Sequence, residues 1–251
     1  MTPISRYALA ALLVATAALA PIFPGAPLHA DSRLDAETQS SMKRLFLPIP
    51  PGRGLDHRKV ALGDRLFHDP SLSRDRTIAC ANCHDVAAGG DDGKRVSTGI
   101  GRSATKRNAQ TVYNVGLQQF FFWDGRARSL EEQIDGPILS PIEMASDWAV
   151  IVERVSQDPA YRKSFGALYG RINVATIKDA IVQYEKSLNT PGSAFDKFLA
   201  GDTNALTLDE LQGLELFVQI GCAACHQGML LGGDLFQRSG VYQSKDGDLE
   251  S

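Results

Sequence analysis

The pentapeptides CANCH at residues 80–84 and CAACH at residues 222–226 contain all four cysteines of this 251-residue chain. In the pattern C-x-x-C-H, two thiols can add to the two vinyl groups of a haem, and the following histidine then lies beneath the iron as its proximal ligand. The two motifs therefore predict two covalently bound c-type haems. Cys80 and Cys83 would attach the first haem, and His84 would bind its iron. Cys222 and Cys225 would attach the second haem, and His226 would bind its iron.

Two other uses of four cysteines explain less of this pattern. An exported chain would favour disulfides. However, a C-x-x-C disulfide closes a very short loop and is strained, and two of them would not stabilise a fold by joining distant segments. Four thiolates could also hold zinc, which leaves the histidine after each cysteine pair unexplained. Haem attachment accounts for every fixed position of both motifs.

The first 30 residues differ in character from the rest of the chain. Arg6 is the only charged residue among them apart from the titratable His29, and an apolar stretch follows it. Pro21 and Pro24 shorten this stretch below the length of a comfortable membrane span. We interpret residues 1–30 as a signal peptide, with an uncleaved anchor helix as the alternative. The protein is therefore expected to be exported to the periplasm, without a stable membrane span after cleavage.

The composition is that of an ordinary globular protein. Hydrophobic residues make up 43% of the chain and charged residues 22%, and the formal net charge is -3. A small negative charge without a basic tract gives no electrostatic basis for binding nucleic acid, so no nucleic-acid partner is expected.

Helical patterns surround both motifs. Thr207 and Glu210 form a capping box at the start of a predicted helix over residues 207–220, which leads directly into the second motif. Further helices are predicted over residues 174–188, around residues 148–155, and from a capping box of Ser129 and Glu132. Long alternating strand patterns are absent, so the predicted fold class is all-α.

A weak internal repeat predicts two haem domains. The segment ALGDRLF at residues 61–67 precedes the first motif, and LQGLELF at residues 211–217 precedes the second. The sequence NTPGS at residues 189–193 breaks the helical pattern between them. We therefore expect two cytochrome c-like domains, over residues 31–189 and 190–251.

Three segments carry a resemblance to a known family. They are LGDRLFHDPSLSRDRTIACANCHD at residues 62–85, RNAQTVYNV at 107–115 and FFFWDGRARSLEEQIDGPILSPIEM at 120–144. They resemble the bacterial di-haem cytochrome c peroxidases, a family that includes the MauG-type enzymes. The resemblance implies that H2O2 is reduced to water at the first haem, with electrons relayed through the second from a small cytochrome c or cupredoxin. It also implies that a homodimer can form.

The same resemblance suggests roles for individual side chains. Trp123 matches a tryptophan that lies between the two haems and relays electrons. Gln133, Pro137 and Glu143 match residues of the distal pocket of the first, peroxidatic haem. Asn108 matches a ligand of a calcium ion between the domains, so Ca²⁺ joins the two haems as an implied cofactor.

The residue types suit peroxide chemistry. Cleavage of the O–O bond needs a proton to move from one oxygen to the other, and a carboxylate in an apolar pocket can carry it as base and then acid. Glu143 lies between Ile142 and Met144, and burial would raise its pKa. Gln133 could orient the peroxide by hydrogen bonding. Pattern alone leaves ordinary alternatives open: a core tryptophan at 123, a surface glutamate and a solvent-facing glutamine.

Two positions depart from the family pattern. Many members have a histidine ligand in the loop after the first motif, where alignment places Ile100, so we expect a five-coordinate first haem that is open to peroxide. The family takes the sixth ligand of the second haem from farther downstream, whereas the chain ends 25 residues after His226. Met229 is too close to His226 to reach the opposite face of the ring. We therefore expect an incomplete second haem domain of reduced stability, with an exposed or misligated haem.

The sequence leaves two other functions open. One is a MauG-like oxidase that acts on a partner protein. The other is a non-enzymatic electron carrier or an inactive truncated remnant. Glu143 and Gln133 argue against a pure carrier, because a carrier needs a coordinatively saturated iron.

Overall fold

The structure, a computed structural model, describes residues 36–236 except for 53 and 234. The predicted signal peptide at residues 1–30 lies outside the described residues. So do residues 237–251, the end of the predicted second haem domain.

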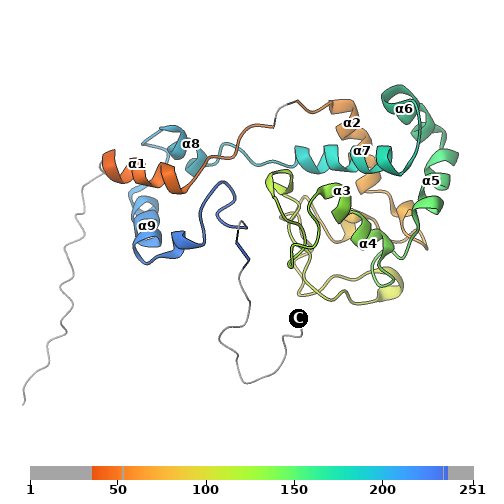
Figure 1. The fold of residues 1–251 in the computed structure, drawn as a ribbon, viewed down its shortest axis with the longest axis horizontal. Coiled ribbons are helices and arrows are strands. Elements are labelled where there is room, and N and C mark those ends of the chain that lie inside the picture. Colours follow the sequence, from red (N-terminus) through yellow and green to blue (C-terminus); the bar gives the residue numbers. More distant parts are fainter. Residues whose placement is uncertain (1–35, 53, 234, 237–251) are drawn as a thin grey trace, which may run out of the picture. The chain divides into compact units, whose positions relative to one another are not determined.

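The described chain consists of helices joined by long loops (Figure 1). The α-helices are α1 (Ala36–Leu45), α2 (His57–Phe67), α3 (Leu130–Gln133), α4 (Asp135–Leu139), α5 (Trp148–Gln157), α6 (Pro159–Tyr169), α7 (Val174–Ser187), α8 (Ala194–Ala200) and α9 (Leu208–Gln219). Short 3-10 helices are η1 (Pro70–Leu72), η2 (Cys80–Asn82), η3 (Ile100–Arg102), η4 (Val115–Leu117) and η5 (Cys222–Ala224). Outside these helices, the described residues contain only isolated β-bridges, so the predicted all-α class is confirmed.

Local sequence signals explain where several helices begin. At the start of α9, Thr207 Oγ1 accepts from the Glu210 N–H at 3.3 Å, and the Glu210 carboxylate accepts from the Thr207 N–H at 2.7 Å, which confirms the predicted capping box. Ser129 Oγ accepts from the Glu132 N–H at 3.1 Å as predicted. However, the Glu132 carboxylate accepts from the N–H of Arg128 rather than Ser129, so only half of that box forms.

Among the described residues, helices α2 and α7 pack against each other more extensively than any other two helices. Gly63 makes their close approach possible, because a Cβ atom there would overlap the carbonyl oxygen of Ala180 and lie 2.8 Å from Tyr184 Cβ. The Phe67 ring packs against the Tyr184 ring with 5.1 Å between centroids. The glycine in the predicted helical segment 61–67 is therefore a packing residue.

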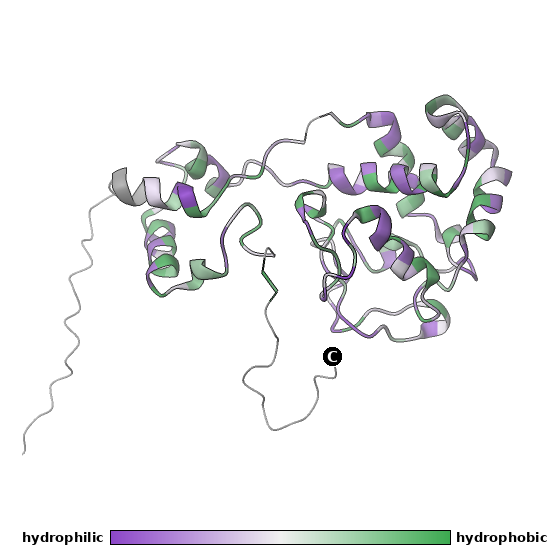
Figure 2. Cartoon of the chain, viewed as in Figure 1, coloured by the Kyte–Doolittle hydropathy of each residue, from purple (hydrophilic) through white to green (hydrophobic). Residues whose placement is uncertain are grey.

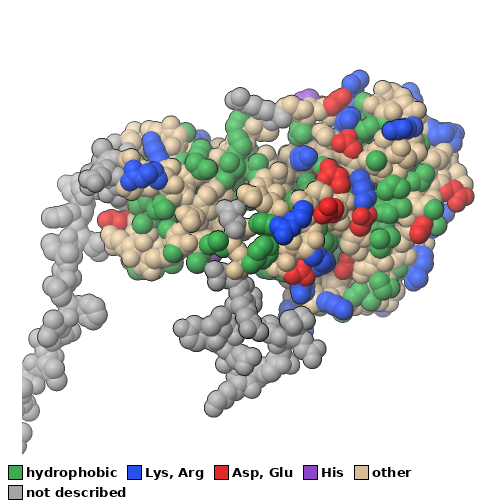
Figure 3. All heavy atoms as spheres, viewed as in Figure 1, with side chains coloured by type: hydrophobic (Ala, Val, Ile, Leu, Met, Phe, Trp, Pro, Cys, Tyr) green, Lys and Arg blue, Asp and Glu red, His purple; other side chains and the backbone are tan. Residues whose placement is uncertain are grey.

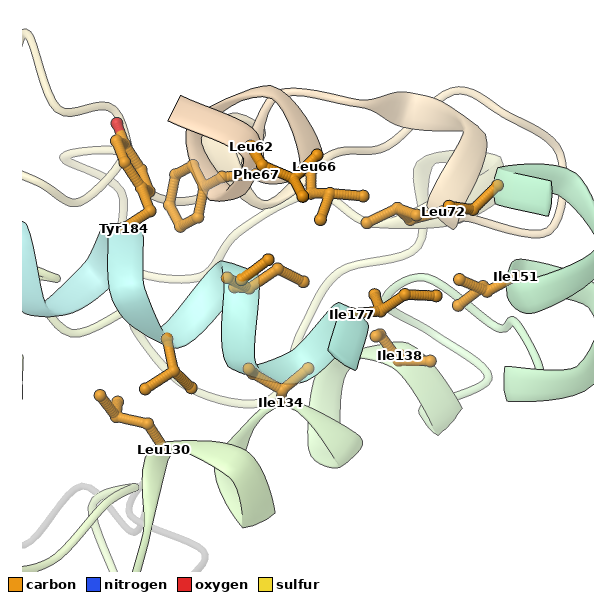
Figure 4. Close-up of a cluster of buried hydrophobic side chains, with 14 of the residues drawn as sticks. Leu62, Leu66, Phe67, Leu72, Leu130, Ile134, Ile138, Ile151, Ile177 and Tyr184 are labelled. Carbon is orange, nitrogen blue, oxygen red and sulfur yellow. The ribbon is translucent and has the colours of Figure 1, made fainter. Parts of the chain in front are cut away.

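Helix α7 is covered on two sides. Figure 4 shows Leu62 and Leu66 of α2 on one side of it and Leu130 and Ile134 on the other. Hydrophobic and hydrophilic residues alternate along α2 and α7 (Figure 2), as expected for helices with one buried face. This first hydrophobic cluster also includes Ile151 and Val155 of α5 and Tyr161 and Phe165 of α6.

A second hydrophobic cluster joins segments that are distant in sequence. Met42 and Phe46, from α1 and its end, are buried together with Phe198 of α8 and Leu211 of α9. The Phe46 ring lies 5.6 Å from that of Phe195. The structure thus adds to the sequence analysis that α1, which precedes the first motif, shares a core with the helices beside the second. The division at residue 189 stays a prediction.

The surface carries mixed charge. Figure 3 shows Lys and Arg side chains interspersed with Asp and Glu on the face that it presents. Among the described residues, no helix is long and apolar enough to cross a membrane.

Candidate functional site

A cavity of about 840 Å³ opens inside the part of the chain that holds the first motif. This volume is within the range of cofactor and ligand sites. Its wall includes Cys80, Cys83 and His84 of the motif, Phe67 of α2 and Ile181 of α7. The first C-x-x-C-H motif therefore faces a preformed space.

A single turn of backbone presents the first motif. In η2, the Cys83 N–H and the His84 N–H both donate to the Cys80 carbonyl, at 3.1 and 3.0 Å. The Asn82 side chain accepts from the Ala79 N–H at 2.6 Å and fixes the start of the turn. These bonds bring two thiols and an imidazole to one wall of the cavity.

The segment before the motif is held from α5. The Arg154 guanidinium donates to the backbone carbonyls of Ser71, Ser73 and Arg74 at 2.6 to 3.0 Å. Ser73 is fully buried, and its Oγ accepts from the Ile78 N–H at 3.0 Å. This arrangement fixes the chain that enters η2.

Both thiols of the first motif are free and partly buried. Burial, with a smaller effect of the Glu185 charge, raises the pKa of Cys80 to about 12, and burial likewise raises the pKa of Cys83. Haem attachment requires reduced cysteines, and both are free of disulfides in the structure. Among the described residues, no three His, Cys, Asp or Glu side chains are grouped as a zinc site would require.

The imidazole of His84 is held in the orientation that an iron ligand needs. Its Nδ1 lies 3.3 Å from the Gly90 carbonyl, and burial lowers its pKa, which favours the neutral ring. A hydrogen on Nδ1 bonded to that carbonyl leaves the lone pair of Nε2 free, as in histidines that bind metals, and the iron-ligand role of His84 stays a prediction. The second motif repeats this feature, because Nδ1 of His226 lies 3.0 Å from the Leu231 carbonyl. Each accepting carbonyl belongs to a loop that contains a Gly-Gly pair.

The second motif follows α9 directly. In η5, the His226 N–H donates to the Cys222 carbonyl at 2.9 Å, as in the first motif. Ala223 is buried in the second cluster, while Cys225 is exposed. The second motif thus repeats the backbone turn and the histidine hydrogen bond of the first, and covalent haem attachment stays a prediction.

The predicted distal residues line the same cavity as His84. Gln133 ends α3, Pro137 lies in α4, and Glu143 follows in the loop before α5. Glu143 is half-buried, and its desolvation raises its pKa against a smaller opposing effect of Arg126. The structure brings these side chains to one space, and their catalytic roles stay predictions.

The loop after the first motif is pinned to the residues around Glu143. The Ile100 N–H donates to the Glu143 carbonyl at 2.8 Å, and a Cβ on Gly99 would overlap the Ile142 carbonyl. Ile100 itself is only 5% exposed. The position expected to carry a ligand histidine in many relatives is therefore occupied here by a buried aliphatic side chain.

Trp123 and Asn108 lie together at the edge of the cavity. The Trp123 side chain is 58% exposed, and its indole N–H donates to the Asn108 carbonyl at 3.0 Å. The Asn108 side-chain amide donates to the Lys94 carbonyl at 2.6 Å. The electron-relay role of Trp123 and the calcium role of Asn108 stay predictions.

Sequence reasoning missed a buried acid in the wall of this cavity. Glu185 of α7 lines it and is only 6% exposed. Burial, and to a lesser degree the charge of Glu131, raises the pKa of Glu185 to about 8. A signal was present in the sequence, because Glu185 falls four residues after Ile181 and eight after Ile177, on the apolar stripe of the predicted helix.

Comparison with known proteins identifies the family of this chain. Residues 57–204 match the family model described as "Di-haem cytochrome c peroxidase". The cytochrome c peroxidase Ccp of Escherichia coli is 46% identical over 196 residues, which are 77% of this chain and 42% of that protein. The cytochrome c551 peroxidase of Nitrosomonas europaea is 44% identical over 184 residues, 72% of this chain and 55% of that protein.

A solved structure gives the same result for the fold. A MauG-like protein associated with microbial copper homeostasis superposes with a TM-score of 0.64 at 29% identity, over 76% of this chain and 59% of that one. The chain thus spans about half the length of the relatives that it matches. On the family match and the two haem-binding motifs, the chain belongs to the di-haem cytochrome c peroxidase family.

Proposed function

We propose that the protein carries two covalently bound haems and reduces hydrogen peroxide to water at the haem held by His84. The overall reaction is H2O2 + 2 e⁻ + 2 H⁺ → 2 H2O. The observation that carries the proposal is one cavity whose wall contains both the first C-x-x-C-H motif and the pair Gln133 and Glu143. An electron carrier alone would need no acid and amide in that space.

The chain's own residues would divide the work as follows. His84 would hold the iron through Nε2, because its Nδ1 faces the Gly90 carbonyl. When bound, the haem supplies an iron that can bind peroxide and pass electrons to it. Glu143 accepts a proton from one peroxide oxygen and returns it to the other, and its raised pKa brings it closer to the operating pH. Gln133 orients the peroxide and hydrogen-bonds to the oxygen that gains charge.

The remaining parts of the proposal rest on the family relationship more than on the geometry of the cavity. Electrons would come from a small cytochrome c or cupredoxin and pass through the haem of the second motif, with Trp123 as relay. The protein would act in the periplasm, bind Ca²⁺ through Asn108, and be able to form a homodimer.

The test uses the full chain exported from a host that matures c-type cytochromes. Its mass should exceed that of the polypeptide by two haems, and it should oxidise reduced cytochrome c in the presence of H2O2. Glu143→Gln should lower the rate by roughly 10²- to 10⁴-fold, the usual contribution of a general acid–base group. Glu153→Gln, an exposed acid on α5 outside the cavity, is the matched control and should retain full activity.

Two results would contradict this assignment. A protein with both haems and no peroxide turnover would favour an electron carrier. Equal rates for Glu143→Gln and the parent would remove the proton-transfer role of that residue.

The coordination of the first haem can be tested separately. Because Ile100 is buried and aliphatic at the position expected for a ligand histidine, we propose that the first iron is five-coordinate in the oxidised protein. Electron paramagnetic resonance should then show a high-spin ferric signal from one haem. A spectrum with only low-spin signals would refute the open site.

A second function, MauG-like oxidation of a partner protein, is favoured by the same Ile100 observation and by the likeness to a MauG-like structure. Dependence on the reductant distinguishes the two. A peroxidase turns over continuously with a reduced small redox protein, whereas a MauG-like oxidase leaves oxidised residues in a protein substrate.

A further inference from the structure

Glu185 occupies an unusual place in the wall of the first haem cavity. It lies on α7 one turn after Ile181, and both residues line the cavity. The Glu185 side chain is 6% exposed, and within the described part of the chain its Oε2 has no hydrogen-bond partner and its carboxyl forms no ion pair. A buried acid without a partner is costly to ionise, so such a residue needs an explanation.

The groups around Glu185 do not neutralise it. From η2 the Cys80 thiol faces it, and from α3 the Glu131 carboxyl acts on it with like charge. The neighbouring elements α2 and η4 contribute the uncharged Phe67 and Val115 to the same wall. Once Cys80 is consumed as a thioether, none of these facing groups can balance a carboxylate. A positive charge to balance Glu185 would therefore have to come from a cofactor bound in the cavity.

We propose that Glu185 is the proton-coupled group of the first haem. This rests on haem attachment at Cys80, which is part of the proposed function. The Glu185 carboxylate would take up one proton from solvent when a reduced cytochrome c or cupredoxin delivers one electron to the haem that His84 would hold. The carboxylic acid would release that proton when the electron leaves.

The direction of this coupling follows from electrostatics. Reduction removes one positive charge from the cavity, so the negative carboxylate becomes less favourable and the protonated acid more so. The coupling is reciprocal, so ionisation of Glu185 favours the oxidised iron and lowers its reduction potential. In a shielded cavity this interaction is much stronger than in water. Burial raises the pKa of Glu185 to about 8 in the chain without haem, so a change of cofactor charge acts on a group that titrates near neutral pH.

The experiment measures the reduction potential of each haem against pH, by spectroelectrochemistry on the full haem-loaded chain. In the parent, the reduction potential of the first haem should fall with rising pH in a window around pH 8. The equilibrium constant for reduction should change by up to tenfold per pH unit, which is about 59 mV for one electron. In Glu185→Gln, which keeps the shape but cannot ionise, the slope in this window should vanish. Glu153→Gln is the control and should retain the parent slope.

A second measurement does not depend on the variant folding. The redox-difference infrared spectrum of the parent should contain the C=O stretching band of a carboxylic acid that forms on reduction. A flat potential across this window in the parent, the same slope in Glu185→Gln, or a parent spectrum without that band would overturn the inference while leaving the peroxidase proposal intact. A mature chain without haem on Cys80 would overturn both.

Discussion

Gly63→Ala offers the sharpest test of how the first cluster is built. The added Cβ would overlap the Ala180 carbonyl oxygen and lie 2.8 Å from Tyr184 Cβ. That carbon–carbon separation is about 1 Å shorter than the optimum. Backbone and Cβ atoms cannot rotate away, so α2 and α7 must move apart. Overpacking by one methyl group typically costs about 1–3 kcal/mol, and this contact belongs at the upper end of that range.

The matched control is Gly166→Ala in α6, where an added Cβ meets no atom within 4 Å. Alanine in a helix interior is favoured over glycine by roughly 0.5–1 kcal/mol, so the control should stabilise the protein. The two identical changes should therefore shift the urea unfolding midpoint in opposite directions. Because Phe67 of α2 and Ile181 of α7 line the haem cavity, Gly63→Ala should also lower the haem content of the exported protein. A Gly63→Ala variant as stable as the parent would refute the close crossing of the two helices.

Three further outcomes are expected. The free energy of unfolding should fall as pH rises from about 4.5 to about 8, because the folded state keeps the proton on Glu185 that the unfolded state loses. The variant Glu185→Gln should lack this part of the pH dependence. Arg154→Met should cost about 1–3 kcal/mol in chemical denaturation, because three backbone carbonyls lose their donor. Thr207→Ala should cost about 1 kcal/mol by removing the cap of α9, and no loss of stability would show that α9 does not need it.

Local signals in the sequence were sufficient to predict the helices beside the motifs. The box of Thr207 and Glu210 formed as predicted, because both partners lie within one turn and need no tertiary contact. The box of Ser129 and Glu132 formed only in part, because the carboxylate found the Arg128 N–H, one residue farther from the helix. Such a choice between adjacent donors depends on the conformation of the preceding loop, which residue types do not specify.

The parts of the site that depend on tertiary structure were harder to predict. Gly63 is an isolated glycine in a helical pattern, and only the position of Ala180 on α7 shows that it permits a backbone contact. Glu185 stands on an apolar stripe, but the sequence alone does not reveal that this stripe faces a cavity. Gln133 and Glu143 were assigned through family resemblance, and the structure adds that they line the space that holds His84.

Helices α1, α8 and α9 share one hydrophobic cluster, and this affects the order in which parts of the chain can fold. Because a chain emerges from its N-terminal end, in synthesis or in export, Phe46 becomes available about 150 residues before Phe195. During that time all the residues of the first cluster become available to pack, while α1 has yet to meet its partners. Proteolysis of nascent chains should therefore cut near α1 long after the first cluster has become resistant.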